Sequence, residues 1–255
     1  MSPEPSRRER RALETRMMQL GVSSSSDYVK LLESPEGIDE LRYLISLVTV
    51  GKTEFFRDET QLTAFSKRVL PQLISVAKGE GRQVRVWSAG CATGEEGYTL
   101  AMLADELGAD SHAVSILGTD VNVSSIAIAS RGIYALKRLG GLSNDRRARF
   151  FLQVGNEFVA NDLLRRCVAF RVHNLVDRDW SFISPGGFDV IFCRNVLMYF
   201  DNAVVASILD RFYEALRPGG LLFLGYSEAF LRMGTRFNRV EIEGVFIFQR
   251  PHATE

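Results

Sequence analysis

The chain has 255 residues, of which 46% are hydrophobic and 24% charged, a mixture typical of a globular protein with a substantial core. Its 31 basic and 31 acidic residues give a formal net charge of +0, which argues against a general electrostatic attraction to nucleic acid or to a membrane surface. This length predicts one large domain, or one domain with a small annex.

The cysteines and the N-terminus indicate the cellular compartment. Cys91, Cys167 and Cys193 lack the spacing of a metal site, and unpaired thiols are typical of a reducing cytosol. The N-terminus is charged and polar, and no apolar run reaches membrane-spanning length. We therefore expect a cytoplasmic, monomeric protein that is not inserted in a membrane.

Residues 1–75 are predicted to form a helical N-terminal domain and a linker. The first helix carries Leu13, Met17 and Leu20 on one side and ends at Gly21. A cluster of arginines is more often a solvated helix face than a binding site, but it can also be a docking patch for an acidic partner. The basic residues of this cluster are Arg7, Arg8, Arg10, Arg11 and Arg16.

A short run at residues 49–58 precedes the next apolar helix. Phe55 and Phe56 are adjacent aromatics that we expect to pack in the core. Arg57 follows them directly, and a guanidinium in such surroundings favours contact with a carboxylate. The run is therefore a candidate binding segment.

The most informative stretch is residues 84–104. An apolar, β-branched run at 84–89 predicts a strand, and residues 95–104 show helical spacing of apolar side chains. Between them, Gly90 and Gly94 allow close approach of a ligand to the backbone. The dinucleotide pattern of glycines is missing, and Glu95 and Glu96 would repel a phosphate. The stretch favours a ligand with cationic groups and ribose hydroxyls, such as S-adenosylmethionine; the alternative is a close-packed turn with ordinary helix-start glutamates.

A second strand, at residues 114–120, ends in Asp120. An acid at this place in a nucleotide-binding sheet holds ribose hydroxyls, although it can also be an ordinary helix N-cap. From about residue 132 the alternation of strand and helix is lost. We expect an inserted small β subdomain at about 140–167, lying over the ligand edge of the sheet.

The alternation of strand and helix then resumes and predicts a mostly parallel, doubly wound sheet in the domain at 76–255. A helix is expected at 203–216, ended by the glycines at 219 and 220. The three histidines are scattered and support neither a zinc site nor a catalytic triad. The remaining strands are predicted at 168–172, 188–193, 221–225 and 244–249.

Six stretches in the same order and spacing resemble the chemotaxis receptor glutamate methyltransferases, the CheR family. The run after the fourth predicted strand, Arg194-Asn195-Val196 with its tyrosine, is far more specific than the glycine turn. The matching stretches are 53–58 (TEFFRD), 86–96 (VWSAGCATGEE), 118–120 (GTD), 174–175 (NL), 188–201 (FDVIFCRNVLMYFD) and 216–220 (LRPGG).

The resemblance implies an α/β fold: a Rossmann-like class I methyltransferase sheet with a small N-terminal helical domain and an inserted small β subdomain. It implies methyl transfer from S-adenosylmethionine to glutamates in the cytoplasmic helical region of chemoreceptors, with S-adenosylhomocysteine as product and the basic N-terminal helix meeting the receptor. Arg57 and Tyr199 would be nearest the transferred methyl. By position, the cofactor-binding residues would be Thr53, Arg57, Ala89, Glu95, Asp120, Asn174, Leu175, Arg194 and Asn195.

Methyl transfer to a glutamate requires little side-chain chemistry. A carboxyl group with a pKa of about 4.3 is already ionised at neutral pH, so no general base is needed. The site must supply alignment and exclusion of water. We expect Asp120 to hold the ribose hydroxyls, Glu95 to contact the polar groups of the cofactor, and Arg57 with Tyr199 to orient the reacting groups.

Two features depart from the family. Gly51 stands where members usually carry asparagine, and Gly97 where they often carry proline. A lost hydrogen bond at Gly51 would cost about 1 kcal/mol. One alternative is therefore a catalytically impaired signalling or scaffold protein with the methyltransferase fold; another is a methyltransferase of a different acidic protein. A base-modifying enzyme is disfavoured, because residues 194–197 lack the Asn/Asp-Pro-Pro-aromatic turn, and the missing glycine pattern disfavours a dehydrogenase.

Overall fold

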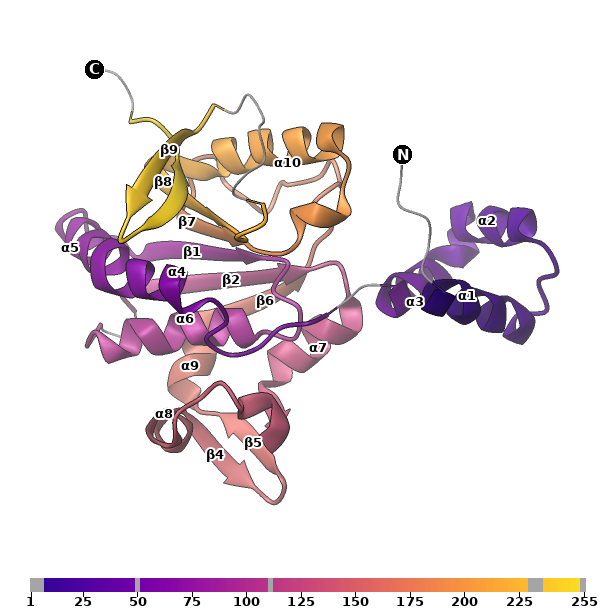
Figure 1. Ribbon diagram of the computed structural model, residues 1–255, viewed down its shortest axis with the longest axis horizontal. Coiled ribbons are helices and arrows are strands. Elements are labelled where there is room, and N and C mark those ends of the chain that lie inside the picture. Colours follow the sequence, from indigo (N-terminus) through magenta and orange to yellow (C-terminus); the bar gives the residue numbers. More distant parts are fainter. Residues whose placement is uncertain (1–6, 49–50, 110–111, 229–235, 253–255) are drawn as a thin grey trace.

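A computed structural model describes residues 7–48, 51–109, 112–228 and 236–252 (Figure 1). The predicted α/β class is confirmed by a seven-stranded sheet in the order β6-β2-β1-β7-β8-β10-β9. The first five strands are parallel to their neighbours, whereas β10 is antiparallel to both β8 and β9. The strands are β1 (Val84–Ala89), β2 (Val114–Asp120), β6 (Val168–Val172), β7 (Phe188–Cys193), β8 (Leu216–Leu224), β9 (Asn238–Ile242) and β10 (Val245–Gln249).

Both faces of this sheet are buried, which is why its central strands are mostly apolar. Successive residues of β1 point to opposite sides: Val86 belongs to one hydrophobic cluster and Trp87 to another. The first cluster includes the helix α6 (Glu95–Glu106), and the second includes α10 (Asn202–Ala215), which Figure 1 shows on the other side of the sheet. The order of the strands reverses at β1, so the carboxyl ends of β1 and β7 border a natural ligand crevice.

Three helices at the N-terminus, α1 (Arg7–Gln19), α2 (Ser25–Glu33) and α3 (Ile38–Val48), form a small group beside the sheet (Figure 1). They are joined through Glu40, which is only 8% exposed. Its carboxylate accepts hydrogen bonds from Arg16 Nη2 at 2.6 Å and Tyr28 Oη at 2.7 Å. The Arg16 hydrogen bond lowers the pKa of Glu40.

The helices that follow belong to the sheet rather than to this group. They are α4 (Glu59–Ala64), a π-helical turn (Phe65–Val69) and α5 (Leu70–Gly79). Phe65 makes an edge-to-face contact with Phe192 of β7, with 5.2 Å between ring centroids. The domain boundary that we predicted between residues 75 and 76 therefore falls inside α5, a helix whose neighbours pack on the sheet.

The inserted β subdomain begins earlier than residue 140. It is a three-stranded antiparallel sheet in the order β3-β5-β4, whose strands are β3 (Ile133–Ala135), β4 (Phe151–Val154) and β5 (Glu157–Ala160). Between β3 and β4 lie a 3-10 turn (Leu136–Leu139) and α8 (Asn144–Phe150). Phe55 packs edge-to-face on Tyr134 and on Phe151, at 5.2 and 5.6 Å.

Tyr98 of α6 also contacts Tyr134, so aromatic packing holds the insertion against residues 51–58 and α6. None of its described residues lines the cavity, which corrects our expectation that it lies over the ligand edge. The chain returns to the large sheet through α9 (Asp162–Cys167), and α7 (Val123–Arg131) packs against β2 and β6. None of the described helices is long and apolar enough to cross a bilayer.

Candidate functional site

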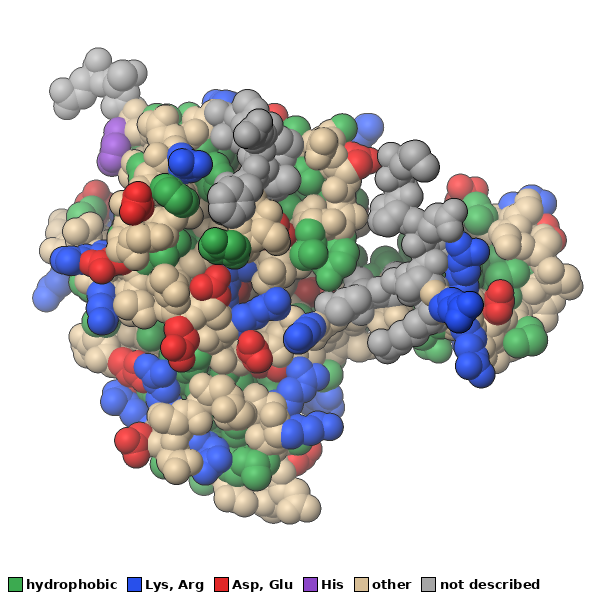
Figure 2. Space-filling view, viewed as in Figure 1, with side chains coloured by type: hydrophobic (Ala, Val, Ile, Leu, Met, Phe, Trp, Pro, Cys, Tyr) green, Lys and Arg blue, Asp and Glu red, His purple; other side chains and the backbone are tan. Residues whose placement is uncertain are grey.

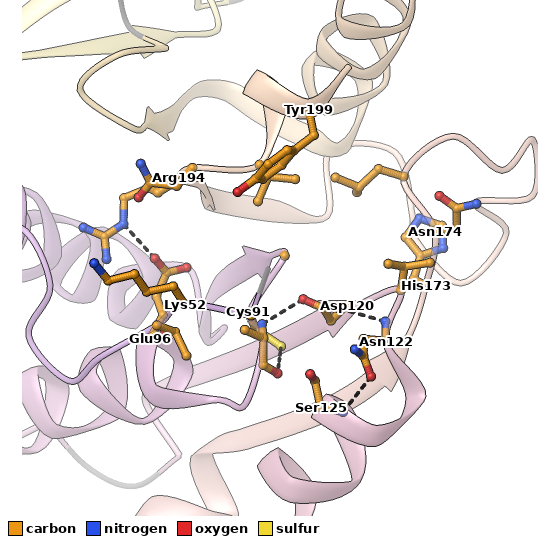
Figure 3. Close-up of a pocket in the computed structure, with 18 of the residues that line it drawn as sticks. Lys52, Cys91, Glu96, Asp120, Asn122, Ser125, His173, Asn174, Arg194 and Tyr199 are labelled. Carbon is orange, nitrogen blue, oxygen red and sulfur yellow. Dashed lines mark hydrogen bonds and ion pairs between the residues drawn. The ribbon is translucent and has the colours of Figure 1, made fainter. Parts of the chain in front are cut away.

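A cavity of about 430 Å³ lies at the carboxyl ends of β1, β2, β6 and β7 (Figure 3), a size suited to a small-molecule ligand. Figure 3 shows two ends: Asp120, Asn122 and Asn174 lie on one side, and Lys52, Glu96 and Arg194 on the other. Its lining residues are Ile45, Gly51, Lys52, Thr53, Glu54, Arg57, Gly90, Cys91, Ala92, Glu96, Asp120, Val121, Asn122, Ser125, His173, Asn174, Leu175, Arg194, Asn195, Val196, Tyr199 and Phe200.

The turn after β1 allows other groups to approach its backbone closely. Gly90 has a φ of +84°, and a Cβ there would lie 2.3 Å from Val196 Cγ2. The backbone N–H groups of Gly90 and Cys91 both donate to the Thr119 carbonyl, which fixes this turn to β2. Only glycine fits at residue 90, because any side chain would push away the turn that follows β7.

Asp120 holds the polar end of the cavity together. Its Oδ2 accepts the Ala92 N–H at 2.8 Å, and its Oδ1 accepts the Asn122 N–H at 2.8 Å. Burial raises the pKa of Asp120, and these backbone hydrogen bonds only partly oppose that rise. Each carboxylate oxygen retains a further lone pair, so the group can accept hydroxyl hydrogen bonds from a ligand.

The two glutamates that start α6 have different environments. Glu95 is fully buried; its carboxylate accepts Thr93 Oγ1 and Arg138 Nη1, the latter at 2.9 Å. Glu96 lines the cavity instead and accepts Arg194 Nε at 2.7 Å. Consecutive helical residues point about 100° apart, so only one of the pair can face the cavity.

A chain of hydrogen bonds holds residues 52–57 beside this pair. Arg194 Nη1 donates to the Arg57 carbonyl at 2.8 Å, and Arg57 Nη1 donates to the Lys52 carbonyl at 2.8 Å. We expected the Arg57 guanidinium to meet a carboxylate, whereas the hydrogen bond that it donates goes to a carbonyl. Lys52 and Arg57 both line the cavity, and neither forms a salt bridge with a described carboxylate. Glu54 lines the cavity as well, so these two cations are accompanied by one carboxylate besides the Glu96–Arg194 pair.

The turn after β7 supplies the opposite wall. Asn195 has a φ of +60°, and a 3-10 turn (Leu197–Tyr199) follows, anchored by the buried Leu197. Tyr199 is 57% exposed, and its ring projects into the cavity from the side opposite Cys91 (Figure 3). An accessible phenol at the mouth can contact both a bound ligand and an incoming side chain.

Nucleophilic catalysis by the cavity's own side chains is disfavoured. Burial raises the pKa of the Cys91 thiol well above its usual range, and burial lowers the pKa of the His173 imidazole. Both groups are therefore neutral near pH 7, and a buried thiol is a poor nucleophile. Within the described part of the chain, no cluster of three metal-ligating side chains occurs.

The structure brings most of the predicted site residues together. Ala89 and Glu95 do not line the cavity; Ala89 is a buried residue at the end of β1. The residues that do line it are Thr53, Arg57, Asp120, Asn174, Leu175, Arg194, Asn195 and Tyr199. We did not predict the polar lining residues Lys52, Cys91, Glu96, Asn122, Ser125 or His173. Five of these six stand within three residues of a predicted one, and Ser125 is the exception.

The family model described as "CheR methyltransferase, SAM binding domain" matches residues 51–246, more than half of the chain. The chain belongs to the CheR methyltransferase family. The resemblance noted in the sequence and the predicted class I methyltransferase fold are thereby confirmed.

Relatives in this family cover most of the chain. Chemotaxis protein methyltransferase 1 of Pseudomonas aeruginosa is 36% identical over 241 residues, 91% of this chain and 85% of its own length. The chemotaxis protein methyltransferase of Escherichia coli is 34% identical over 227 residues, 87% of this chain and 76% of its own length. This CheR-family chain is an S-adenosylmethionine-dependent methyltransferase.

The residues of the cavity fit S-adenosylmethionine. Asp120 offers acceptors for ribose hydroxyls, and Gly90 lets a ligand lie against the backbone. Gly51 lines the cavity without a side chain, and Ser125, whose Oγ lies 3.9 Å from where a Cβ of residue 51 would be, lines it as well. The family match and the chemotaxis methyltransferase relatives do not favour the impaired-scaffold alternative.

Proposed function

We propose that this methyltransferase esterifies glutamate side chains in the cytoplasmic helical region of chemoreceptors, as part of sensory adaptation. The observation that supports this most directly is the arrangement of the cavity. A carboxylate at one end can hold the ribose, and two cations without a described carboxylate partner, Lys52 and Arg57, lie at the other end beside Arg194. The names of the relatives, chemotaxis protein methyltransferases, support the same substrate class.

When bound, S-adenosylmethionine supplies an electrophilic methyl group; the protein supplies position. Asp120 would hold the ribose, and Thr53, Asn174, Leu175 and Asn195 would complete the pocket. Glu96, rather than the buried Glu95, would face the polar groups of the cofactor. Arg57 would attract the target carboxylate, which is ionised at neutral pH and needs no base, and Tyr199 would orient it.

The direct test is transfer of a labelled methyl group to a purified receptor cytoplasmic fragment. A base-labile label at glutamate, released as methanol, is the expected result. A receptor fragment whose candidate glutamates are replaced by alanine is the matched control. Label on another acidic protein and none on the receptor would instead support the alternative substrate class.

Tyr199→Phe is expected to lower kcat about ten- to hundredfold, because a hydrogen bond to a charged group contributes about 1.5–3 kcal/mol. The affinity for S-adenosylhomocysteine should change less than about threefold, since the rest of the pocket stays in place. Methyl transfer gives kcat and calorimetry gives the affinity. Equal losses in both quantities would contradict this role for Tyr199.

We further propose that the basic N-terminal helix contacts the acidic receptor. A shallow groove along α1 is lined by Arg7, Arg10, Arg11 and Arg16. Figure 2 shows a row of basic side chains on the N-terminal helices. Arg16 is an unsuitable contact, because its guanidinium is bonded to Glu40. Arg8 lies in α1, but its side chain is outside the described part of the structure.

Replacing both Arg7 and Arg11 with glutamate is expected to raise KM for the receptor fragment at least about fivefold at low salt, with less effect as salt rises. The affinity for S-adenosylhomocysteine should not change. The control is the same charge change on the far side, Lys67→Glu with Lys78→Glu, both exposed. If the two double variants have equal KM values, α1 is not the receptor contact.

A further inference from the structure

Glu228 is a buried carboxylate that no site assignment uses. It is 1% exposed and follows β8 in a short turn, in which the Glu228 N–H donates to the Gly225 carbonyl at 2.9 Å. Within the described residues its side chain has no salt bridge; it is surrounded by backbone donors instead. Burying a carboxylate costs free energy unless several hydrogen bonds satisfy it, so these hydrogen bonds indicate a structural role for Glu228.

The Glu228 side chain holds the turn that follows β7 in place. Glu228 Oε2 accepts the N–H of Asn195 at 2.8 Å and that of Gly225 at 2.8 Å, and Oε1 accepts the N–H of Met198 at 3.2 Å. Asn195 and Met198 bracket the start of the 3-10 turn that ends at Tyr199. One side chain therefore fixes both ends of the segment from which Tyr199 projects.

Two glycines show how tightly this segment is enclosed. A Cβ at Gly225 would lie 2.5 Å from Glu228 Oε2 and 2.9 Å from the Asn195 nitrogen. On the other side, Val196 packs against Gly90. Because Asn195 has a φ of +60°, its backbone has an unfavourable conformation that needs support from outside the turn.

From this geometry we infer that Glu228 is a positioning residue for methyl transfer: it fixes the Asn195–Met198 backbone so that Tyr199 is directed into the cavity. The inference rests on the proposed function, because it assumes the role of Tyr199 described above. Glu228 itself is not among the described residues that line the cavity.

Glu228→Gln is the decisive variant, since a glutamine has only one acceptor oxygen and must lose the hydrogen bonds at one end of the turn. We expect kcat for methyl transfer to fall at least about tenfold, while the affinity for S-adenosylhomocysteine changes less than about threefold. In the Tyr199→Phe background the same substitution should lower kcat by no more than about threefold, because residues that act as a unit are not additive. Independent, multiplying effects would overturn the inference, as would equal losses of kcat and affinity.

Asp189→Asn is the matched control. Asp189 is also a buried carboxylate, near the amino end of β7, where it accepts the Arg85 N–H at 2.8 Å and pairs with Arg82 at 2.9 Å. The Asp189→Asn variant should have a lower melting temperature but an unchanged kcat. Gly225→Ala places a Cβ against the Glu228 carboxylate and the Asn195 nitrogen, and should lower kcat as Glu228→Gln does. A normal kcat in Gly225→Ala would count against the inference.

A readout that does not need activity separates this inference from the proposed function. If the wild-type chain methylates no receptor, the proposed function fails and Glu228 is judged by amide hydrogen exchange. Faster exchange at Asn195 and Met198 in Glu228→Gln, but not in Asp189→Asn, supports the positioning role. Unchanged exchange at these amides overturns it.

Discussion

Asp120→Ala is expected to weaken S-adenosylhomocysteine binding at least about hundredfold. Two hydrogen bonds from hydroxyls to a carboxylate contribute about 1.5–3 kcal/mol each, and 1.4 kcal/mol is a factor of ten in affinity. The substitution also releases the Ala92 N–H, which Asp120 Oδ2 accepts at 2.8 Å, so the turn after β1 loses a tether. Calorimetric titration measures the dissociation constant.

The control and a pH series make this test specific. Asp162→Ala, at the exposed start of α9, should bind normally; equal weakening in both variants would contradict the assignment. Burial raises the pKa of Asp120, and the ligand favours the ionised carboxylate. Affinity should therefore fall as the pH falls through that raised pKa, and Asp120→Asn should lose this dependence. By the same linkage, the stability contributed by Asp120 is present at low pH and is lost as the pH rises through its raised pKa.

Arg194→Met is expected to lower the free energy of unfolding by about 3–5 kcal/mol, the usual cost of leaving one partner of a buried ion pair uncompensated. The pair is well buried: the Arg194 side chain is 5% exposed and that of Glu96 is 12% exposed. The variant also removes the hydrogen bond to the Arg57 carbonyl, so methyl transfer should be lost. Urea unfolding monitored by circular dichroism measures the stability change.

Two comparisons show whether burial is the cause. The exposed pair between Arg236 and Glu214, with side chains 54% and 56% exposed, should contribute less than about 1 kcal/mol when Arg236 is replaced by methionine. Replacing Glu96 by leucine together with Arg194→Met should recover much of the stability without recovering activity. A loss no larger than that of Arg236→Met would contradict the expected role of the buried pair.

The sequence was most informative where burial and chemistry agree. The apolar runs of β1 and β7 predicted central strands because both faces of these strands are covered. In contrast, β9 was not predicted: its sequence, Asn238–Ile242, alternates polar residues at the sheet edge and carries little apolar signal. The Arg217–Gly220 run was expected to end a helix, but it lies inside β8, where the pairing register shifts.

The candidate site was predictable in its strand ends but not in its side-chain directions. Asp120 ends β2, Arg194 directly follows β7, and both line the cavity as expected. The choice between Glu95 and Glu96 depended on which of two adjacent helical side chains meets Arg138 and which meets Arg194. Both arginines are distant in the sequence, so periodicity within α6 could not decide between the glutamates.

Two parts of the chain, the N-terminal helices and the edge of the large sheet, contribute residues to the wall of the cavity. Ile45, on α3, lines it together with residues from the edge of the large sheet, yet the family model begins at residue 51. The stretch matched by the family model and the unit that lines the cavity are therefore different in extent. A fragment trimmed to residues 51–246 would retain every strand of the sheet except the last residues of β10, while opening one apolar side of its ligand cavity to water.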